Sequence, residues 1–131
     1  TNRSILDIFQ DEGQNHFREL ETITLRTISK KTIVACGGGA PIYNNNMNYI
    51  NDSGLSIYLK ASVDEIFNRL SNNYKKRPLI KDKSRKYLKK FIEDALVKRN
   101  KFYLMADYTI DTNNLSEKDV LRKINSLPIF I

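Results

Sequence analysis

The sequence predicts an α/β fold with a mostly parallel sheet. Two short apolar runs, residues 32–36 and 55–60, have the composition of strands, and a third short strand is expected at 108–111. Helical patterns stand before, between and after these runs, and such alternation is typical of a parallel sheet covered by helices. The glycine run 37–39 directly follows the first strand, as expected where backbone must approach another group closely; such a run can also simply reverse the chain.

Two helices are expected at the start of the sequence. Ser4 is a suitable N-cap for a short helix over residues 5–10, with Asp7 three positions later and Gly13 as its end. A longer helix is expected over residues 16–29, where apolar side chains recur at helical spacing.

Capping and turn residues define the elements in the middle of the chain. A short helix over residues 46–52 ends at Gly54, and the alternating strand 55–60 follows it. Ser62 and Glu65 have the spacing of a capping box, which predicts a helix that ends near residue 70.

The last third of the sequence begins with a polar and basic stretch, residues 71–83, which predicts a mobile loop. A long helix is expected over residues 84–105, capped by the serine at its first position. The short strand 108–111 follows, and Ser116 caps a final helix that ends before Pro128.

Composition limits the class of protein. The 131 residues suit a single domain, and 40% apolar with 28% charged residues is typical of a soluble globular protein. No apolar run approaches the roughly 20 residues that span a bilayer. The single cysteine, Cys36, can form no disulfide within the chain, which favours a cytoplasmic location. A net charge of +7 favours anionic partners such as nucleotides, phosphates, carboxylates or nucleic acid.

Arg99 stands out within the long helix 84–105. It falls near the middle of an apolar stripe formed by Leu88, Phe91, Ile92, Ala95, Phe102 and Tyr103. A guanidinium is always charged and is costly to bury alone, so it needs a carboxylate of the protein or of a ligand. The alternative is an arginine that extends past its neighbours to solvent or caps helix carbonyls.

The helix 16–29 contains a similar arrangement. Glu21 lies inside its apolar stripe and Arg18 lies on the flank, and residues three apart on a helix are neighbours that can pair. The pair is either an ordinary surface ion pair or a buried carboxylate that orients an arginine toward a bound anion.

A cluster of cations on the predicted loop 71–83 is the third candidate feature. It comprises Lys75, Lys76 and Arg77, followed by Pro78 and Leu79. Such a cluster suits closure over phosphates, and a solvated surface or a nucleic-acid patch are the alternatives.

In chain order, these residues resemble the shikimate kinase family. Residues 4–21 are similar to the family's segment S-I-x-x-I-F…G-E-x-x-F-R-x-x-E, with Gln14 in place of the usual glutamate. Gly37-Gly38-Gly39 is similar to the family's glycine loop, and Arg77-Pro78-Leu79 is similar to its lid. Lys98-Arg99 with Tyr103 is similar to the helix that bears its second arginine, and Asp111-Thr112-Asn113 is similar to its turn beside the adenine.

The resemblance implies a three-layer, parallel-sheet P-loop kinase fold of the nucleoside-monophosphate-kinase type. It implies transfer of the γ-phosphate of ATP, as its Mg²⁺ complex, to the 3-hydroxyl of shikimate in aromatic amino-acid biosynthesis. The implied parts of the single domain are a shikimate-binding segment (1–29), a glycine loop (37–39), a lid (71–83) and C-terminal helices (84–131). The implied site comprises residues that bind shikimate (Arg18, Arg99, Gly37, Gly38, Gly39, Phe9, Phe17), a supporting carboxylate (Glu21), a catalytic and nucleotide-binding arginine (Arg77) and a nucleotide-binding residue (Asn113).

The sequence departs from the family pattern at its start. It contains no G-x-x-x-x-G-K-[ST] motif, which would supply backbone amides and lysine to the phosphates and a hydroxyl to Mg²⁺. We therefore expect a fold incomplete at the N-terminus, without the family's first two strands and first helix. We also expect most ATP and Mg²⁺ ligands to lie outside this sequence, no metal ligand within it, and a chain that is inactive as it stands.

Two other functions remain open at this point. One is a basic module that binds nucleic acid or another polyanion through residues 75–90; the other is a related small-molecule kinase with a different carboxylate acceptor. A polyanion-binding module needs exposed cations and stacking aromatics, whereas Arg18 and Arg99 lie on or beside apolar stripes and only Tyr74 and Tyr87 are nearby aromatics. We therefore expect shikimate and ATP as partners of a monomer, without nucleic acid or membrane.

Overall fold

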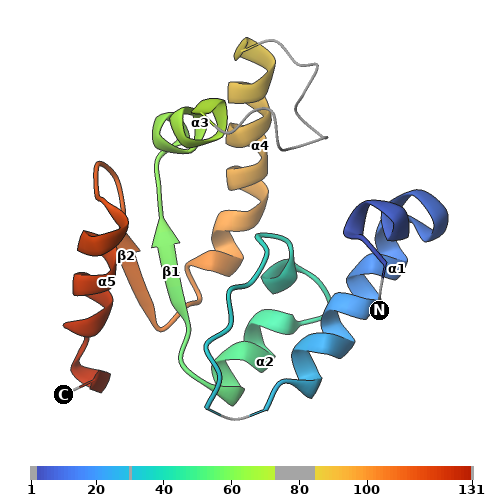
Figure 1. The fold of residues 1–131 in the computed structure, drawn as a ribbon, viewed down its shortest axis with the longest axis horizontal. Helices are drawn as coiled ribbons and strands as arrows, with labels where there is room; N and C mark the ends of the chain where they lie inside the picture. Colours follow the sequence, from blue (N-terminus) through green and yellow to red (C-terminus); the bar gives the residue numbers. More distant parts are fainter. Residues whose placement is uncertain (1–2, 30, 73–84, 131) are drawn as a thin grey trace. The chain divides into compact units, whose positions relative to one another are not determined.

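The computed structural model describes residues 3–29, 31–72 and 85–130, which form several helices and a small sheet (Figure 1). The contacts divide the chain into two compact units, Thr1–Gly54 and Leu55–Ile131, and each is described by itself. The expectation of a single domain over residues 1–131 stays a prediction. None of the helices in the described part of the chain is long and apolar enough to cross a membrane.

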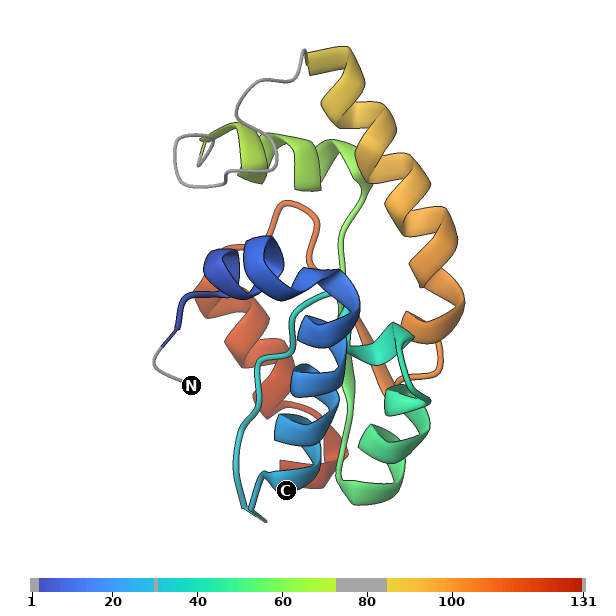
Figure 2. The same ribbon diagram turned by 90° about the vertical axis from the view of Figure 1, so that its right-hand side faces the viewer.

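Helix α1 (Ile5–Thr27) dominates the first unit. Ser4 and Asp7 form the predicted capping box: Ser4 Oγ accepts from the Asp7 amide at 3.1 Å, and the Asp7 carboxylate accepts from the Ser4 amide at 3.3 Å. Gly13 (φ 82°, ψ 173°) interrupts the helical backbone, and the helix changes direction there (Figure 2). The two predicted helices are therefore confirmed as the two arms of a kinked α1.

Gly13 should be the least replaceable glycine for folding. Its φ and ψ lie in a region that is essentially restricted to glycine, where another residue costs about 1–3 kcal/mol. Gly13→Ala is therefore expected to lower the free energy of unfolding by about that amount in urea titrations. Gly54→Ala is the matched control, because Gly54 has extended backbone (φ −175°) and open space beside its Cα. Equal stability of the two variants would contradict a conformational role for Gly13.

The strand predicted over residues 32–36 is wrong. These residues form no strand; Ile33 is fully exposed (101%) and Val34 is 44% exposed. In the described ranges the sheet contains only β1 and β2, so the run has no partner for its backbone N–H and C=O groups. After the glycine run, the chain forms a 3₁₀ helix, η1 (Ala40–Ile42), and then α2 (Asn46–Ser53), which ends at Gly54 as predicted.

The second unit contains a two-stranded parallel sheet. Strand β1 (Ile57–Lys60) pairs with β2 (Tyr108–Asp111) in a register that runs from Ile57 opposite Tyr108 to Lys60 opposite Asp111. This confirms the parallel arrangement and the bounds predicted for the last strand. The helices of this unit are α3 (Val63–Asn72), α4 (Arg85–Tyr103), α5 (Glu117–Asn125) and the short η3 (Pro128–Phe130).

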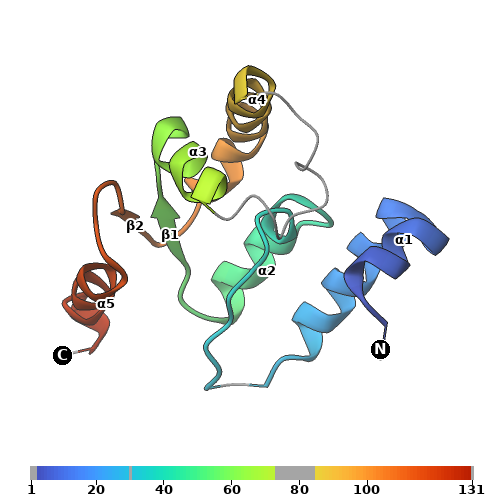
Figure 3. The same ribbon diagram turned by 45° about the horizontal axis from the view of Figure 1, so that its top comes forward.

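The apolar core of the second unit lies between α3 and α4, which lie next to each other (Figure 3). Phe67 of α3 packs with Leu88 and Ile92 of α4, and partly buried side chains surround them: Val63, Ile66, Leu70 and Leu96. Two members of the predicted α4 stripe are thus buried, whereas Phe91 is 45% exposed.

Of the capping patterns predicted in this unit, the cap at Ser116 is confirmed, whereas the capping box at Ser62 and Glu65 is only half formed. Ser116 and Asp119 form a capping box at the start of α5. Ser62 Oγ accepts from the Glu65 amide at 3.2 Å, while the Glu65 carboxylate pairs with Arg69 at 2.8 Å. The predicted mobile loop 71–83 and the serine predicted to cap α4 fall almost wholly on residues 73–84, which lie outside the described residues.

Candidate functional site

Arg18 and Glu21 face each other on α1. Arg18 Nη1 donates to Glu21 Oε2 at 2.6 Å, and the two side chains are 14% and 18% exposed. The pairing expected from their spacing is therefore confirmed. Because both groups are largely withdrawn from water, the attraction exceeds that of an exposed surface pair. The carboxylate fixes one edge of the guanidinium.

Aromatic rings flank the Arg18 guanidinium. Its Cζ lies 5.1 Å from the centre of the Phe17 ring and 4.9 Å from that of the Tyr43 ring, within the range of cation–π attraction. Phe9 packs on Phe17 with ring centres 4.7 Å apart, and Gln14 Nε2 donates to Tyr43 Oη at 3.2 Å. The predicted residues Phe9 and Phe17 thus pack on each other, and Phe17 lies beside Arg18.

The glycine run passes directly against Arg18. A Cβ at Gly39 would lie 2.4 Å from Arg18 Nη1 and 2.5 Å from Cζ, closer than real Cβ contacts. Gly39 has an ordinary φ of −87°, so the approach of Arg18, and not the backbone conformation, requires glycine there. A Cβ at Gly37 would meet Glu21 Oε1 at 3.5 Å, an ordinary contact. The close approach that the glycines predicted is therefore made to the ion pair of α1.

Two nitrogens of the Arg18 guanidinium have no hydrogen-bond acceptor among the described residues. Nη1 is bonded to Glu21, while Nε is buried and, like Nη2, donates to no acceptor within the described ranges. Hence the first unit presents a positioned cation with unused donors beside exposed backbone at Gly37 and Gly38. Such a group can bind an anion such as a carboxylate through charge-assisted hydrogen bonds.

Cys36 immediately precedes the glycine run. Although Cys36 is exposed, desolvation of its thiol raises the pKa, and the negative charge of Glu21 raises that pKa further. The thiol therefore stays protonated at neutral pH and is a poor nucleophile.

Polar residues that the sequence did not single out connect α1 to the loop. Asn46 is fully buried, and its Nδ2 donates to Thr22 Oγ1 at 3.0 Å and to the Ala40 carbonyl at 2.9 Å. Asn44 Nδ2 also donates to Thr22 Oγ1 at 3.0 Å. The run of asparagines at 44–46 could have indicated this turn, because asparagine favours turns and left-handed backbone. Asn44 and Asn45 do have left-handed backbone, with φ of 50° and 57°.

Arg99 lies in α4 of the second unit. Its side chain is half-buried, and it makes no hydrogen bond or ion pair within the residues that the structure describes. No second charge compensates it there, in contrast with Arg18. A cavity of about 340 Å³ on the same unit does not include Arg99 in its lining, which comprises Tyr58, Lys60, Ala61, Ser62, Val63, Leu96, Val97 and Asn100.

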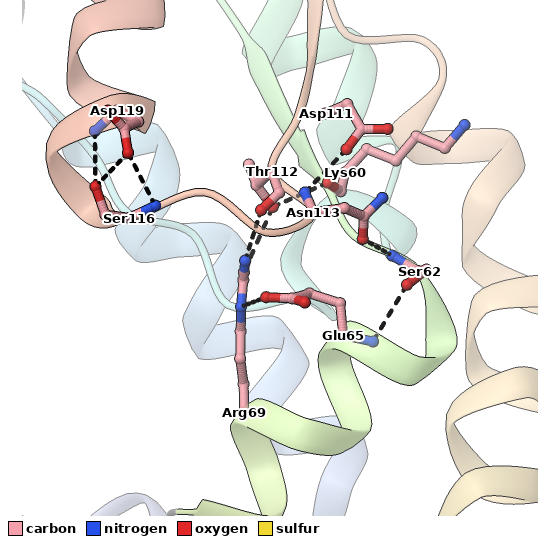
Figure 4. Close-up of polar contacts among 9 residues, drawn as sticks. All are labelled: Lys60, Ser62, Glu65, Arg69, Asp111, Thr112, Asn113, Ser116 and Asp119. Atoms are coloured by element: carbon pink, nitrogen blue, oxygen red, sulfur yellow. Dashed lines mark hydrogen bonds and ion pairs between the residues drawn. The ribbon is translucent and has the colours of Figure 1, made fainter.

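The turn after β2 is held by a hydrogen-bond network (Figure 4). Asn113 Oδ1 accepts from the Ser62 amide at 2.8 Å, and the Asn113 amide donates to Asp111 Oδ1 at 2.9 Å. Thr112 is buried, and its carbonyl accepts from Arg69 Nη2 at 2.8 Å. The network joins the C-terminal ends of both strands to α3. The side-chain oxygen of Asn113 therefore already has a structural partner.

Two further expectations concern the lid cations and the metal ligands. Arg77 and its neighbouring cations lie outside the described residues. Within the described ranges, no group of three or more His, Cys, Asp or Glu side chains comes together as a metal site would require. Because Mg²⁺ in kinases is bound by one or two carboxylates together with substrate phosphates, this does not test the expectation that the sequence contains no metal ligand, which stays a prediction.

Comparisons with known proteins agree with one another. A family model described as shikimate kinase matches residues 1–127. A shikimate kinase of Parabacteroides distasonis is 38% identical over 128 residues, which cover 95% of this chain and 74% of the relative. A shikimate kinase of Flavobacterium johnsoniae is 36% identical over 127 residues, covering 94% and 74%. The crystal structure of a shikimate kinase from Bacteroides thetaiotaomicron superposes with a TM-score of 0.89 at 29% identity, covering 95% of this chain and 74% of that one.

Proposed function

Because the chain belongs to the shikimate kinase family, we propose that the protein transfers the γ-phosphate of ATP to the 3-hydroxyl of shikimate. The observation that carries this proposal most directly is the environment of Arg18. A guanidinium that is fixed by Glu21 at 2.6 Å and still has unused donors is prepared for an anionic ligand. Shikimate carries one carboxylate, which such a guanidinium recognises well.

Each predicted residue has a proposed role in binding shikimate. Arg18 holds the carboxylate, and Glu21 orients Arg18 without touching the substrate. Phe9 and Phe17 line the pocket. The backbone of Gly37, Gly38 and Gly39 contacts the ring hydroxyls, which is supported by the exposure of the first two of these glycines.

Nucleotide handling is proposed for residues of the second unit. Arg77 neutralises charge on the transferring phosphate and contacts the nucleotide, as the lid arginine of phosphoryl-transfer enzymes does. Asn113 is proposed to lie beside the adenine. Its hydrogen bond with the Ser62 amide supports a fixed position for this turn. Magnesium, when bound with ATP, neutralises phosphate charge.

A polyanion-binding module is the alternative function. It predicts cations that are exposed and interchangeable, whereas Arg18 is only 14% exposed and is committed to Glu21. We also propose a monomer in the cytoplasm; the location is supported by the single cysteine, which can form no disulfide within the chain.

The proposed function is tested by coupled measurement of ADP release with ATP, with and without shikimate. Because the sequence contains no phosphate-loop motif, residues 1–131 alone should release no ADP in this assay. With a G-x-x-x-x-G-K-[ST] segment supplied at the N-terminus, we expect release that depends on shikimate and saturates with it. Other hydroxylated carboxylates, tested in parallel, distinguish a related kinase. Release independent of shikimate, together with salt-sensitive binding to random DNA, would favour the polyanion-binding module instead.

Arg99→Met tests the second proposed shikimate-binding arginine. Since Arg99 is half-buried and has no charged partner in the described ranges, its removal should leave the melting temperature unchanged or raise it. Loss of one charge-assisted bond of about 1.5–3 kcal/mol should weaken shikimate binding by about 10- to 150-fold. Binding of ATP should hardly change.

Lys98→Met is the control for Arg99→Met, because it removes a charge from the neighbouring, exposed position of the same helix. Calorimetric titration and thermal melts should show no effect of this control on shikimate affinity. If Arg99→Met melts lower and binds shikimate normally, Arg99 is a structural residue.

A further inference from the structure

Asn46 connects the two backbone segments that meet at Arg18. It is the first residue of α2 and has no exposed surface. Its Nδ2 donates one hydrogen bond to the Ala40 carbonyl at 2.9 Å and one to Thr22 Oγ1 at 3.0 Å. Because a carbonyl oxygen can only accept, the nitrogen end of the amide must face Ala40. Both amide hydrogens are therefore used within this contact.

Thr22 transmits the contact to Arg18. Its hydroxyl donates to the Arg18 carbonyl at 2.9 Å and accepts from Asn44 and Asn46, each at 3.0 Å. A hydroxyl has one donor and two acceptor positions, so Thr22 Oγ1 is fully satisfied. This series of hydrogen bonds runs from the Ala40 carbonyl through the Asn46 amide and the Thr22 hydroxyl to the backbone of Arg18.

The two ends of this series of hydrogen bonds lie at the two sides of the contact between Gly39 and Arg18. Ala40 directly follows Gly39, whose Cα faces the Arg18 guanidinium, and the other end is the backbone carbonyl of Arg18 itself. The Asn46 amide therefore sets the distance between the glycine loop and α1. That distance determines where the guanidinium can lie.

We propose that Asn46, acting through Thr22, is a positioning residue for shikimate binding. The inference rests on the proposed function, and it adds a role to residues that do not touch the substrate. With no exposed surface, Asn46 acts only by fixing the loop against α1. Side chains that orient a binding group in this way change function without contacting the ligand.

Asn46→Asp is the sharpest substitution. It keeps the shape but replaces the donating NH₂ with an oxygen that faces the Ala40 carbonyl. The loop should then move away from α1, and Arg18 should lose its fixed position. We expect the KM and the dissociation constant for shikimate to rise by about 10- to 100-fold, as for other groups that orient a binding residue. The KM for ATP should stay within about twofold of that of the unmodified protein.

Thr22 and Asn48 supply matched controls. Thr22→Val removes the hydroxyl and should weaken shikimate binding in the same sense, whereas Thr22→Ser keeps the hydroxyl and should restore it. Asn48→Asp makes the same chemical change at an exposed position two residues later in α2. It removes the hydrogen bond from Asn48 Nδ2 to Asn45 Oδ1 but leaves the bonds to Thr22 and Ala40 in place, so the KM for shikimate should not change. If Asn46→Asp does not fold, the comparison of Thr22→Val with Thr22→Ser tests the positioning role instead.

Shikimate titrations and steady-state kinetics on the whole protein and its variants test whether Asn46 and Thr22 position the shikimate site. If the unmodified protein does not bind shikimate, the proposed function fails. If it binds, and Asn46→Asp or Thr22→Val melts lower but keeps the unmodified KM for shikimate, these residues are merely structural and the inference is overturned. A selective rise in the KM for shikimate, reversed in Thr22→Ser, is the result that supports positioning.

Discussion

Arg18→Met is expected to weaken shikimate binding more than any other single substitution considered. The variant loses the guanidinium donors, and each charge-assisted bond of about 1.5–3 kcal/mol corresponds to about a 10- to 150-fold change in the dissociation constant. It also leaves Glu21 without its partner at 18% exposure, which disfavours anion binding nearby and lowers stability. Calorimetric titration with shikimate and a thermal melt measure the two effects.

Arg26→Met is the control for the loss of charge from the same helix. Arg26 is exposed and stacks on Tyr49 with its Cζ 5.7 Å from the ring centre. Its replacement should leave shikimate affinity within about twofold. Arg18→Lys should recover only part of the affinity, since an ammonium cannot reproduce the fork of a guanidinium. Equal losses in Arg18→Met and Arg26→Met would indicate a general charge effect.

Gly39→Ala is expected to reduce shikimate affinity strongly, with an unusual separation of binding from stability. The new Cβ would collide with the guanidinium at 2.4–2.5 Å. The guanidinium is the end of a flexible side chain, so it can move away at small cost to folding, but it then leaves the position set by Glu21. Shikimate affinity should fall by about 10-fold or more, while the free energy of unfolding changes by about 1 kcal/mol or less.

Gly54→Ala is the control for adding a methyl group at a glycine. No atom lies within 4 Å of a Cβ added at Gly54, so Gly54→Ala should change neither the shikimate affinity nor the free energy of unfolding appreciably. Calorimetry and urea titrations of the two alanine variants make the comparison. Should Gly39→Ala unfold easily and yet retain its affinity for shikimate, Gly39 would serve packing alone.

Local patterns in the sequence predicted much of the fold. Ser4 with Asp7, and Ser116 with Asp119, are capping boxes whose hydrogen bonds close within three residues, so the helix starts could be derived from adjacent residues. The pairing of Arg18 with Glu21 followed in the same way from helical spacing.

Features that depend on distant partners could not be predicted from the sequence. Residues 32–36 have the composition of a strand, but a strand exists only when a neighbour satisfies its backbone. The glycine run indicated a close approach, but not that Arg18 makes it, 21 positions from Gly39 in sequence (39 − 18). The bond between Asn46 and Thr22 spans 24 residues and leaves no periodic signal.

The central claim is that the contact between Gly39 and Arg18 serves shikimate binding. A double-mutant cycle in shikimate affinity, measured by calorimetry for Arg18→Met, Gly39→Ala and the double variant, tests it most directly. Methionine ends before the guanidinium atoms that the new Cβ would meet, so Gly39→Ala should have little further effect once Arg18 is replaced. A double variant no weaker than Arg18→Met is the predicted result. Losses that add fully, each substitution weakening binding independently of the other, would contradict the account.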